Sequence, residues 1–338
     1  MKYHLSFHDI LFNAIQAQSY SSWIGTLKKE SLTKDLIEQY ELVPQGLKWH
    51  PEFLLSKHVF LVSVSLLRQE MPDLLETAFL HDWGKIHTTN IGKNRIYSFN
   101  HEMVSLDKIN EVKENLKFPD LTYTTTKNHM KYKSIGDKEI ENNLYMKEFV
   151  KADKVMSEIL FYEFFFQDKE SNELKEKELF DLQENSDKVI YIPIGISGSG
   201  KSTYIRKNFD SSVIVSPDQI RKEINGDISS QANSDIVWNT TKSRLVDLIN
   251  KKKIAVLDAT NVDRYRRVIF MSNFNGCKKV ALVFPISIQE AFDRVSKDIE
   301  NNINRSNVPL KVIERQYRNL EKGFDSLFNE FTEVNVIE

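Results

Sequence analysis

The sequence contains one cysteine, Cys277, and no apolar run that approaches the roughly 18 residues of a membrane span. A single cysteine excludes an intramolecular disulfide and a zinc site built from cysteines. The opening stretch MKYHLSFHDILFNAIQ has polar residues within its apolar part and no small-residue cleavage site, which makes it a poor signal peptide. We therefore expect a cytoplasmic protein without a membrane partner.

A large excess of one charge sign is also missing, but the charge is unevenly distributed. Residues 188–338 contain 23 Lys and Arg against 18 Asp and Glu, whereas residues 1–187 contain 23 against 30. Segment 168–187 alone has 8 acidic and 3 basic residues. Because a chain of 338 residues suggests two domains, we predict domains at 1–167 and 188–338, joined by a charged connector at 168–187.

The first 167 residues have the pattern of a helical domain. Segment 54–68, LLSKHVFLVSVSLLR, is apolar almost all round, as a core helix is. Pro72-Asp73 is predicted to start another helix, and segment 144–166 is helix-periodic and rich in phenylalanine. No convincing alternating strand occurs, so an all-α bundle is expected.

The rest of the chain alternates between short apolar runs and amphipathic segments. The predicted strands are VIYIPIG at 189–195, SVIVS at 212–216, IAVLD at 254–258, VALVFPI at 280–286 and VNVI at 334–337. Segments 231–250 and 309–329 are predicted helices. This alternation is typical of an α/β domain with a parallel sheet.

The strongest motif in this half is GISGSGKST at 195–203. It fits the phosphate-binding pattern G-x-x-x-x-G-K-[ST], with a predicted strand before it and a helix after it. Glycines let backbone N–H groups approach phosphate oxygens, and the helix N-terminus favours an anion. We expect ATP or another NTP here, with the lysine on the phosphates and the serine on Mg²⁺. The predicted nucleotide contacts are Gly195, Ser197, Gly198, Ser199, Gly200, Lys201, Ser202 and Thr203.

Asp218 and Arg221 follow the second predicted strand. Three residues apart on a helix, they lie on one face, which at the end of a parallel sheet overlooks the ligand crevice. The carboxylate can accept a hydroxyl proton, and the arginine can hold an anionic group of the phosphate acceptor. A helix-capping aspartate beside a solvent-exposed arginine is the alternative.

Two further features belong to the predicted nucleotide site. Asp258 follows the third strand and is expected to support Mg²⁺ or the phosphate-binding loop. The polar stretch 294–308 is predicted to be a lid, in which Arg294 and Arg305 contact the transferred phosphate. Either arginine could equally be a surface charge.

All eight histidines precede residue 130, and several lie on apolar helices. His58 is in the predicted core helix, His81-Asp82 ends the run LLETAFLHD, and Asp153 lies within segment 144–166. A buried, unpaired carboxylate is costly, so a shared metal ion is the simplest partner. Imidazole and carboxylate ligands suit Mn²⁺, Fe²⁺, Co²⁺, Ni²⁺ or Zn²⁺. Any one of these histidines alone could still be an ordinary core or surface residue.

The motifs of the second half resemble the 5′-hydroxyl polynucleotide kinases of phage and bacterial nucleic-acid repair. The resemblance rests on GISGSGKST, D-x-x-R at 218–221, DATN at 258–261 and R…VP at 305–309. It implies that Asp218 is the general base for the 5′-OH and that Arg221 holds the 3′-phosphate of the terminal nucleotide. Lys201, Ser202 and, with the loosest alignment, Arg305 complete the catalytic set that the resemblance implies.

The first half resembles the HD-domain phosphohydrolases over roughly residues 45–165. HPEFLLSKH at 50–58, LHDWGK at 80–85 and IYSFNHE at 96–102 carry the resemblance. It implies four metal ligands, namely His58, His81, Asp82 and Asp153. It also implies that Lys85 contacts a substrate phosphate and that His101 and His129 are ligands of a second metal or phosphate contacts; a structural role for these two is equally open.

Together the halves resemble the bifunctional HD-type polynucleotide kinases that heal broken RNA. That resemblance implies a 5′-OH kinase combined with a 2′,3′-cyclic phosphodiesterase and 3′-phosphatase, acting on RNA or DNA ends, with a separate RNA ligase as functional partner. One alternative is a small-molecule or nucleoside kinase fused to a nucleotide phosphohydrolase. Another is a nucleic-acid-binding adaptor that ATP switches without chemistry.

Overall fold

The computed structural model describes residues 6–113, 115–130, 143–228, 230, 232–301 and 308–337. The chain divides into two compact units, a helical unit of residues 1–89 and 96–178 and a sheet unit of residues 90–95 and 179–338. The division falls inside helix α12 (Lys169–Glu184). Most of the predicted connector is therefore helical.

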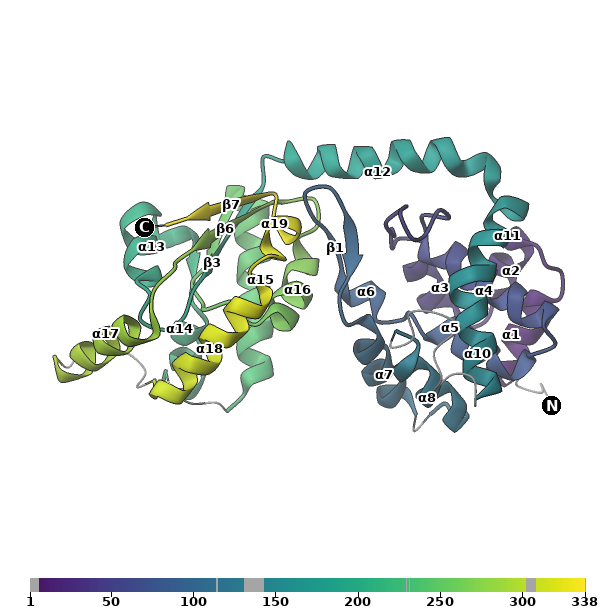
Figure 1. Cartoon of the computed structure of the whole chain (residues 1–338), viewed down its shortest axis with the longest axis horizontal. Coiled ribbons are helices and arrows are strands. Elements are labelled where there is room, and N and C mark those ends of the chain that lie inside the picture. Colours follow the sequence, from purple (N-terminus) through teal and green to yellow (C-terminus); the bar gives the residue numbers. More distant parts are fainter. Residues whose placement is uncertain are drawn as a thin grey trace. The chain divides into compact units, whose positions relative to one another are not determined.

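The helical unit is arranged around helix α4, which packs against α1, α2, α3, α5 and α11 (Figure 1). Every residue from Leu55 to Leu66 of α4 is buried, which confirms the predicted core helix. The α-helices before α12 are α1 (Phe7–Ile15), α2 (Tyr20–Leu27), α3 (Lys34–Tyr40), α4 (Leu55–Arg68), α5 (Leu75–Leu80), α6 (Lys85–Thr88), α7 (His101–Val112), α8 (Asp120–Asn128), α10 (Leu144–Lys151) and α11 (Ser157–Phe164).

Aromatic side chains join the first three helices to this core. The Trp23 ring lies 5.6 Å from the Phe60 ring and 6.4 Å from the Phe79 ring, and all three residues are fully buried. The Tyr40 hydroxyl donates a 2.7 Å hydrogen bond to the carbonyl of Phe79. Residues 7–43 thus complete the hydrophobic core that carries α4 and α5.

Two features of residues 1–167 differ from the sequence-based expectation. The predicted helix 144–166 is interrupted by one turn of π-helix, Ala152–Met156, between α10 and α11. This part of the chain is also not purely α-helical, because β1 (Thr89–Ile91) and β2 (Ile96–Ser98) form a two-stranded sheet. Three-residue strands are too short to produce an alternating pattern, so they could not be predicted.

The sheet unit contains five strands in the order β4-β5-β3-β6-β7, and every neighbouring pair is parallel. The strands are β3 (Val189–Ile194), β4 (Ile214–Val215), β5 (Ile254–Leu257), β6 (Lys278–Val283) and β7 (Glu333–Val336). The helices are α13 (Lys201–Asn208), α14 (Pro217–Asn225), α15 (Ser234–Lys252), α16 (Arg264–Met271), α17 (Ile288–Glu300), α18 (Leu310–Gly323) and α19 (Leu327–Glu330). The predicted parallel sheet is confirmed, and Figure 1 shows β3 within it.

Among the described residues, no helix has both the length and the apolar character that a bilayer crossing requires.

The burial of one carboxylic acid, Glu76, makes the stability of the helical unit depend on pH. Glu76 on α5 is 5% exposed, and its Oε2 atom has no hydrogen-bond partner among the described residues. Burial raises the pKa of Glu76 to about 7. The folded chain therefore holds this proton more tightly than the unfolded chain, and folding loses stability as the pH rises from about 4.5 through 7.

We expect the Glu76→Gln variant to be more stable than the wild type at pH 8 by about 1–3 kcal/mol. At pH 5 the difference should shrink, because the wild-type carboxyl is then mostly protonated in the folded state. Urea unfolding at both pH values measures the effect, with the exposed Glu158→Gln as control. A stability difference that is the same at both pH values would contradict the assignment.

Candidate functional site

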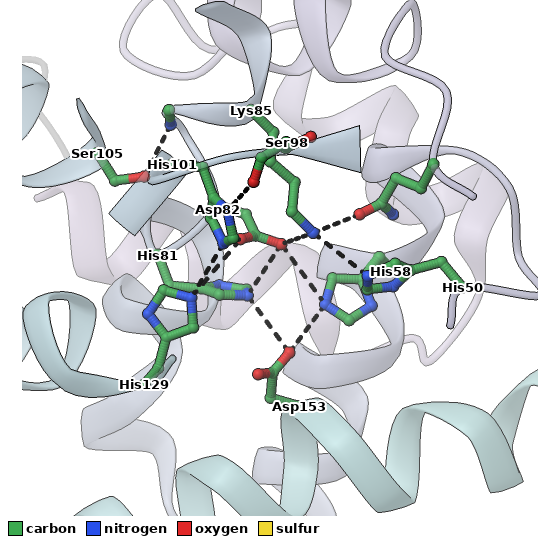
Figure 2. A network of polar contacts seen from close by, with 12 residues as sticks. His50, His58, His81, Asp82, Lys85, Ser98, His101, Ser105, His129 and Asp153 are labelled. Carbon is green, nitrogen blue, oxygen red and sulfur yellow. Dashed lines mark hydrogen bonds and ion pairs between the residues drawn. The ribbon is translucent and has the colours of Figure 1, made fainter. Parts of the chain in front are cut away.

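Four histidine rings surround the carboxylate of Asp82 in the helical unit (Figure 2). His58 lies on α4, His81 directly follows α5, His101 begins α7, and His129 directly follows α8. Their Nε2 atoms lie 3.7, 3.3, 3.0 and 3.8 Å, respectively, from the nearer oxygen of Asp82. All four rings and Asp82 are at most 4% exposed. The structure therefore brings together histidines that the sequence separates by up to 71 positions (129 − 58).

Backbone carbonyls fix the tautomers of three of these rings. The Nδ1 atoms of His81, His101 and His129 lie 2.9, 2.9 and 2.7 Å from the carbonyl oxygen three residues earlier. A carbonyl only accepts, so each Nδ1 must carry the proton and donate. His81 and His129 follow helix ends, where the last carbonyls lack partners within the helix. In the neutral rings, each Nε2 therefore presents a lone pair to the centre.

The two oxygens of Asp82 face different sets of partners. Oδ1 lies nearest to His101 and His129, whereas Oδ2 lies nearest to His58, His81 and Lys85.

Asp153, from the π-helical turn, completes the Oδ2 side of the site. Its Oδ1 lies 3.0 Å from the Nε2 of His58 and 3.5 Å from the Nε2 of His81. The site thus has two halves that share one carboxylate.

Several contacts indicate that a cation belongs in this site. The Nε2 of His81 and the Oδ1 of Asp82 are buried without a hydrogen-bond partner among the described residues. The Nε2 atoms of His101 and His129 lie 3.3 Å apart, and two lone pairs cannot face each other stably without a proton or a metal between them. Two groups with convergent ligand atoms are His58, His81 and Asp82, and Asp82, His101 and His129. This nitrogen and oxygen donor set fits a borderline divalent metal.

The charges lead to the same conclusion. Asp82, Asp153 and Glu52 contribute three negative charges and Lys85 one positive charge, which leaves −2 when the rings are neutral. Burial lowers the pKa of His81, but the Asp82 and Asp153 carboxylates outweigh it and raise this pKa to about 10.

The other pKa shifts follow the same local charges. The pKa of His58 is also raised, because Asp153 and Glu52 outweigh burial. Burial and the nearby His81 and His101 lower the pKa of His129 to about 3. The carboxylates thus favour positive charge at His58 and His81, where they would equally favour a divalent cation.

Gly84 allows α7 to approach the loop that carries Asp82. A Cβ atom at Gly84 would lie 2.1 Å from the carbonyl oxygen of His101 and 2.7 Å from the backbone nitrogen of Ser105. The Gly84 N–H also donates a 2.7 Å hydrogen bond to the hydroxyl of Ser105. This close packing holds His101 against Asp82, which explains the glycine in LHDWGK.

Sequence reasoning missed three residues that adjoin the site, namely Gln45, His50 and Glu52. The Lys85 ammonium lies 2.7 Å from Asp82 Oδ2, 2.6 Å from Gln45 Oε1 and 3.4 Å from His50 Nε2. Lys85 is therefore buried against protein groups here, and its predicted contact with a substrate phosphate stays a prediction. His50 and Glu52 belong to the HPE triplet at 50–52, which has no periodicity, and Gln45 lies outside it.

The sheet unit places the phosphate-binding loop directly after its central strand. Gly195 follows β3, and α13 begins at Lys201 after Gly200, whose φ is +88°. Gly198 has the same φ, and a Cβ there would lie 2.3 Å from the carbonyl oxygen of Ala291. Only glycine fits that position, because it permits both the backbone angle and the approach of α17.

The loop side chains are arranged for a nucleotide with its metal. Lys201 is 7% exposed, and its Nζ donates to the carbonyl of Ile196 at 2.7 Å and to the Ser199 hydroxyl at 3.1 Å. The Ser202 hydroxyl donates a 2.8 Å hydrogen bond to Asp258 Oδ1, just beyond β5. Burial raises the pKa of Asp258, which adjacent Mg²⁺ would counteract. Ser202 and Asp258 are thus the pair that could hold Mg²⁺.

Asp218 and Arg221, which are predicted to serve the phosphate acceptor, both lie on α14. Asp218 and Arg221 form an ion pair, and the Arg221 guanidinium also donates a 3.2 Å hydrogen bond to the carbonyl of Ile228. The Asp218 side chain is 63% exposed, so it can reach a bound hydroxyl.

The remaining residues that were predicted to contact the nucleotide lie in different places. Arg294 on α17 pairs with Glu290 at 2.5 Å, and its Nη1 lies 3.7 Å from the Cβ position of Gly200. Thr203 is exposed on α13, and Arg305 lies outside the described residues. The Ser197 N–H donates a 2.8 Å hydrogen bond to Gln316 Oε1 of α18, a loop contact that sequence reasoning missed.

We expect Gly84→Ala to destabilise the helical unit by about 1–3 kcal/mol, because the new methyl group would push α7 away from the loop. It should also weaken metal binding by displacing His101 from Asp82. Thermal unfolding and a metal titration measure both effects. Gly25→Ala is the matched control, since nothing lies within 4 Å of its Cβ position. Equal behaviour of the two variants would contradict this role for Gly84.

We expect Mn²⁺ or Co²⁺ to stabilise chelator-treated protein by about 2.7 kcal/mol at a concentration 100 times the Kd. Affinity should rise with pH, because the cation must displace protons from His58 and His81. Asp82→Asn should abolish the effect, whereas the exposed Asp107→Asn should preserve it. Differential scanning calorimetry at pH 6.5 and 8 checks this, and equal stabilisation of Asp82→Asn would disprove the cation site.

Comparison with known proteins finds a similarity in the second half of the chain. A family model described as an AAA domain matches residues 190–322, a segment that contains the phosphate-binding loop. No curated protein matches the chain.

Two solved structures are similar to part of it. A chain of the "Structure of the Pnkp1/Rnl/Hen1 RNA repair complex" is 21% identical with a TM-score of 0.39, and the match covers 43% of this chain and 47% of that one. A gluconokinase from Sinorhizobium meliloti 1021 is 16% identical with a TM-score of 0.29, over 45% of this chain and 83% of the other. The chain therefore spans less than half of the first of these relatives.

Proposed function

We propose that the chain is a bifunctional end-healing enzyme for nucleic acids, with RNA as the favoured substrate. In this proposal the sheet unit phosphorylates a 5′-OH with an NTP and Mg²⁺. The helical unit removes a 2′,3′-cyclic, 2′- or 3′-phosphate with a transition metal. The observation that carries the proposal is the presence of two complementary charged sites in one chain: a phosphate-binding loop near an aspartate–arginine pair, and a buried carboxylate among four imidazoles.

In the kinase reaction, the 5′-hydroxyl oxygen forms a bond to the γ-phosphorus while the bond from that phosphorus to the β–γ bridging oxygen breaks. Asp218 accepts the hydroxyl proton, for which its exposed carboxylate is suited. Arg221 holds the phosphate that follows the terminal nucleoside. Lys201 and the loop N–H groups stabilise the charge on the nucleotide phosphates, since preorganised donors need no rearrangement during the transfer.

In the hydrolase reaction, the oxygen of a water molecule attacks the phosphorus at the 3′ end, and a P–O bond to the ribose breaks. The released ribose oxygen takes up a proton and leaves as a hydroxyl, and the attacking water loses one. A divalent cation, when bound, would supply Lewis acidity and a nucleophile from water at neutral pH. His58, His81, Asp82 and Asp153 would hold that cation, and His101 and His129 would serve the second half of the site. Burial of these residues keeps their orientation fixed.

The two reactions make chemical sense together. Many ribonucleases leave a 2′,3′-cyclic phosphate and a 5′-OH, whereas a ligase joins a 3′-OH to a 5′-phosphate. One chain that removes the first phosphate and adds the second would prepare both ends for sealing. A separate RNA ligase is therefore the partner that the proposal implies.

An oligoribonucleotide with a 5′-OH and a 2′,3′-cyclic phosphate tests both activities in one assay. We expect Asp218→Asn to lower 5′ phosphorylation at least about 100-fold and to leave 3′ hydrolysis unchanged. Asp82→Asn should have the reverse effect, because its carboxylate belongs to the other site. The exposed Asp247→Asn on α15 is the matched control.

Each alternative function predicts a different outcome of this assay. Wild-type phosphorylation by Asp218→Asn would refute the assigned base. Phosphorylation of small hydroxyl compounds without transfer to any strand would favour a small-molecule kinase, and NTP binding without any product would favour an adaptor.

A further inference from the structure

Glu52 joins two histidines beside the proposed cation site without facing its centre. It lies in the turn before α4 and is 1% exposed. Its Oε1 atom lies 2.7 Å from the Nδ1 of His58 and 3.2 Å from the Nδ1 of His50. A carboxylate oxygen accepts, so both ring nitrogens donate to it. With Nδ1 protonated, His58 presents its Nε2 lone pair to Asp153 and Asp82.

A chain of contacts runs from Glu52 through His50 and Lys85 to Asp82. The unprotonated Nε2 of His50 accepts from the Lys85 ammonium at 3.4 Å. Lys85 in turn contacts Asp82 Oδ2 at 2.7 Å. Gln45 accepts from the same ammonium at 2.6 Å. The three donors of Lys85 thus have three acceptors. Glu52, His50 and Lys85 connect His58 to Asp82 by a route outside the centre. Figure 2 shows the part of this route from His50 through Lys85 to Asp82.

We propose that Glu52 is the positioning residue of the site, which fixes the tautomer and ring orientation of His58 so that its Nε2 can ligate a divalent cation. The inference rests on the cation site of the proposed function. Its physical basis is general, because a ligating imidazole depends on the acceptor that holds its other N–H group. Among the four central histidines, only His58 has a carboxylate within hydrogen-bond distance of Nδ1 in the described part of the chain. The other three donate to carbonyls, and the Glu102 carboxylate stays 3.9 Å from the Nδ1 of His101.

A cation held directly by His50, Glu52 and His58 is the competing arrangement, since their ligand atoms also converge. Two observations oppose it. Ligand atoms that share one cation at bonds of about 2.1 Å lie roughly 3 Å or more apart, whereas Glu52 Oε1 and His58 Nδ1 are 2.7 Å apart, a hydrogen-bond distance. The Nδ1 of His50 likewise lies at hydrogen-bond distance, 3.2 Å, from the same Glu52 oxygen.

Titration of the full-length, chelator-treated protein with Co²⁺ tests the proposal. We expect Glu52→Ala to weaken Co²⁺ binding about 10- to 100-fold while the number of ions bound at saturation stays unchanged. Glu52→Gln keeps the size and an acceptor oxygen but loses the charge, so a smaller loss of roughly threefold to tenfold is expected. Glu158→Ala is the surface control.

A spectroscopic measurement separates positioning from general destabilisation. In histidine-labelled, metal-free protein at a pH high enough to leave the His58 ring neutral, ¹H–¹⁵N spectra should show His58 as the Nδ1–H form in the wild type and a shift toward the Nε2–H form in Glu52→Ala. His58→Asn identifies the resonances of this ring. His50→Ala keeps the contact between Glu52 and His58, so it should preserve the tautomer.

The possible results are distinct. Wild-type Co²⁺ affinity and an unchanged His58 tautomer in Glu52→Ala and Glu52→Gln, while Asp82→Asn loses binding, would overturn the positioning role alone. A loss of one ion at saturation in Glu52→Ala or His50→Ala would make Glu52 a ligand and also overturn it. If the wild type binds no Co²⁺, the proposed hydrolase site fails and the inference fails with it.

Discussion

The buried carboxylate of Asp82 is the constraint on which the arrangement of the helical unit depends. A charge that is 1% exposed must be compensated, because its transfer from water costs several kcal/mol. The compensation comes from separate elements, since α4, α5, α7 and α8 each bring a histidine to Asp82. Gly84 lets α7 approach closely enough for this. The aromatic core around α4 then supplies the apolar burial that offsets a polar centre.

The predicted phosphate site of the sheet unit has to bind negative charge, and it uses backbone groups rather than a cluster of side chains. Its proposed ligand is an anion, for which backbone N–H groups and one lysine at the start of α13 are sufficient, and these groups follow one another along the chain. A cation needs electron pairs, which side chains supply in greater number and with firmer direction than a single loop does. This difference explains why the phosphate site is contiguous over 195–203, whereas the histidine site is assembled from residues 58 to 153.

The same difference sets how much could be predicted from the sequence. The loop motif and its flanking strand and helix are local, so the parallel sheet and the positions of Ser202 and Asp258 followed from pattern alone. The gathering of His58, His81, His101, His129 and Asp153 around Asp82 was suggested by residue type and resemblance, but their distances depend on tertiary packing. The π-helical turn at Asp153 leaves helix periodicity nearly unchanged, so segment 144–166 reads as one helix. Glu52 and Gln316 had no periodic signal, because each acts through a contact with a distant segment.

Two histidines of the site, His81 and His129, are oriented by the ends of the helices that they follow. A histidine that directly follows a helix finds a carbonyl three residues earlier that no helical N–H uses, as in the contacts of His81 with Ala78 and of His129 with Thr126. The carbonyl fixes the ring, and the negative end of the helix dipole favours a cation beyond it. His58 lies inside α4, where the nearby carbonyls accept hydrogen bonds from N–H groups of the helix itself. No backbone carbonyl is therefore available to accept from the Nδ1 of His58. A side-chain acceptor must take that role, and the buried carboxylate that does so comes from the turn just before α4.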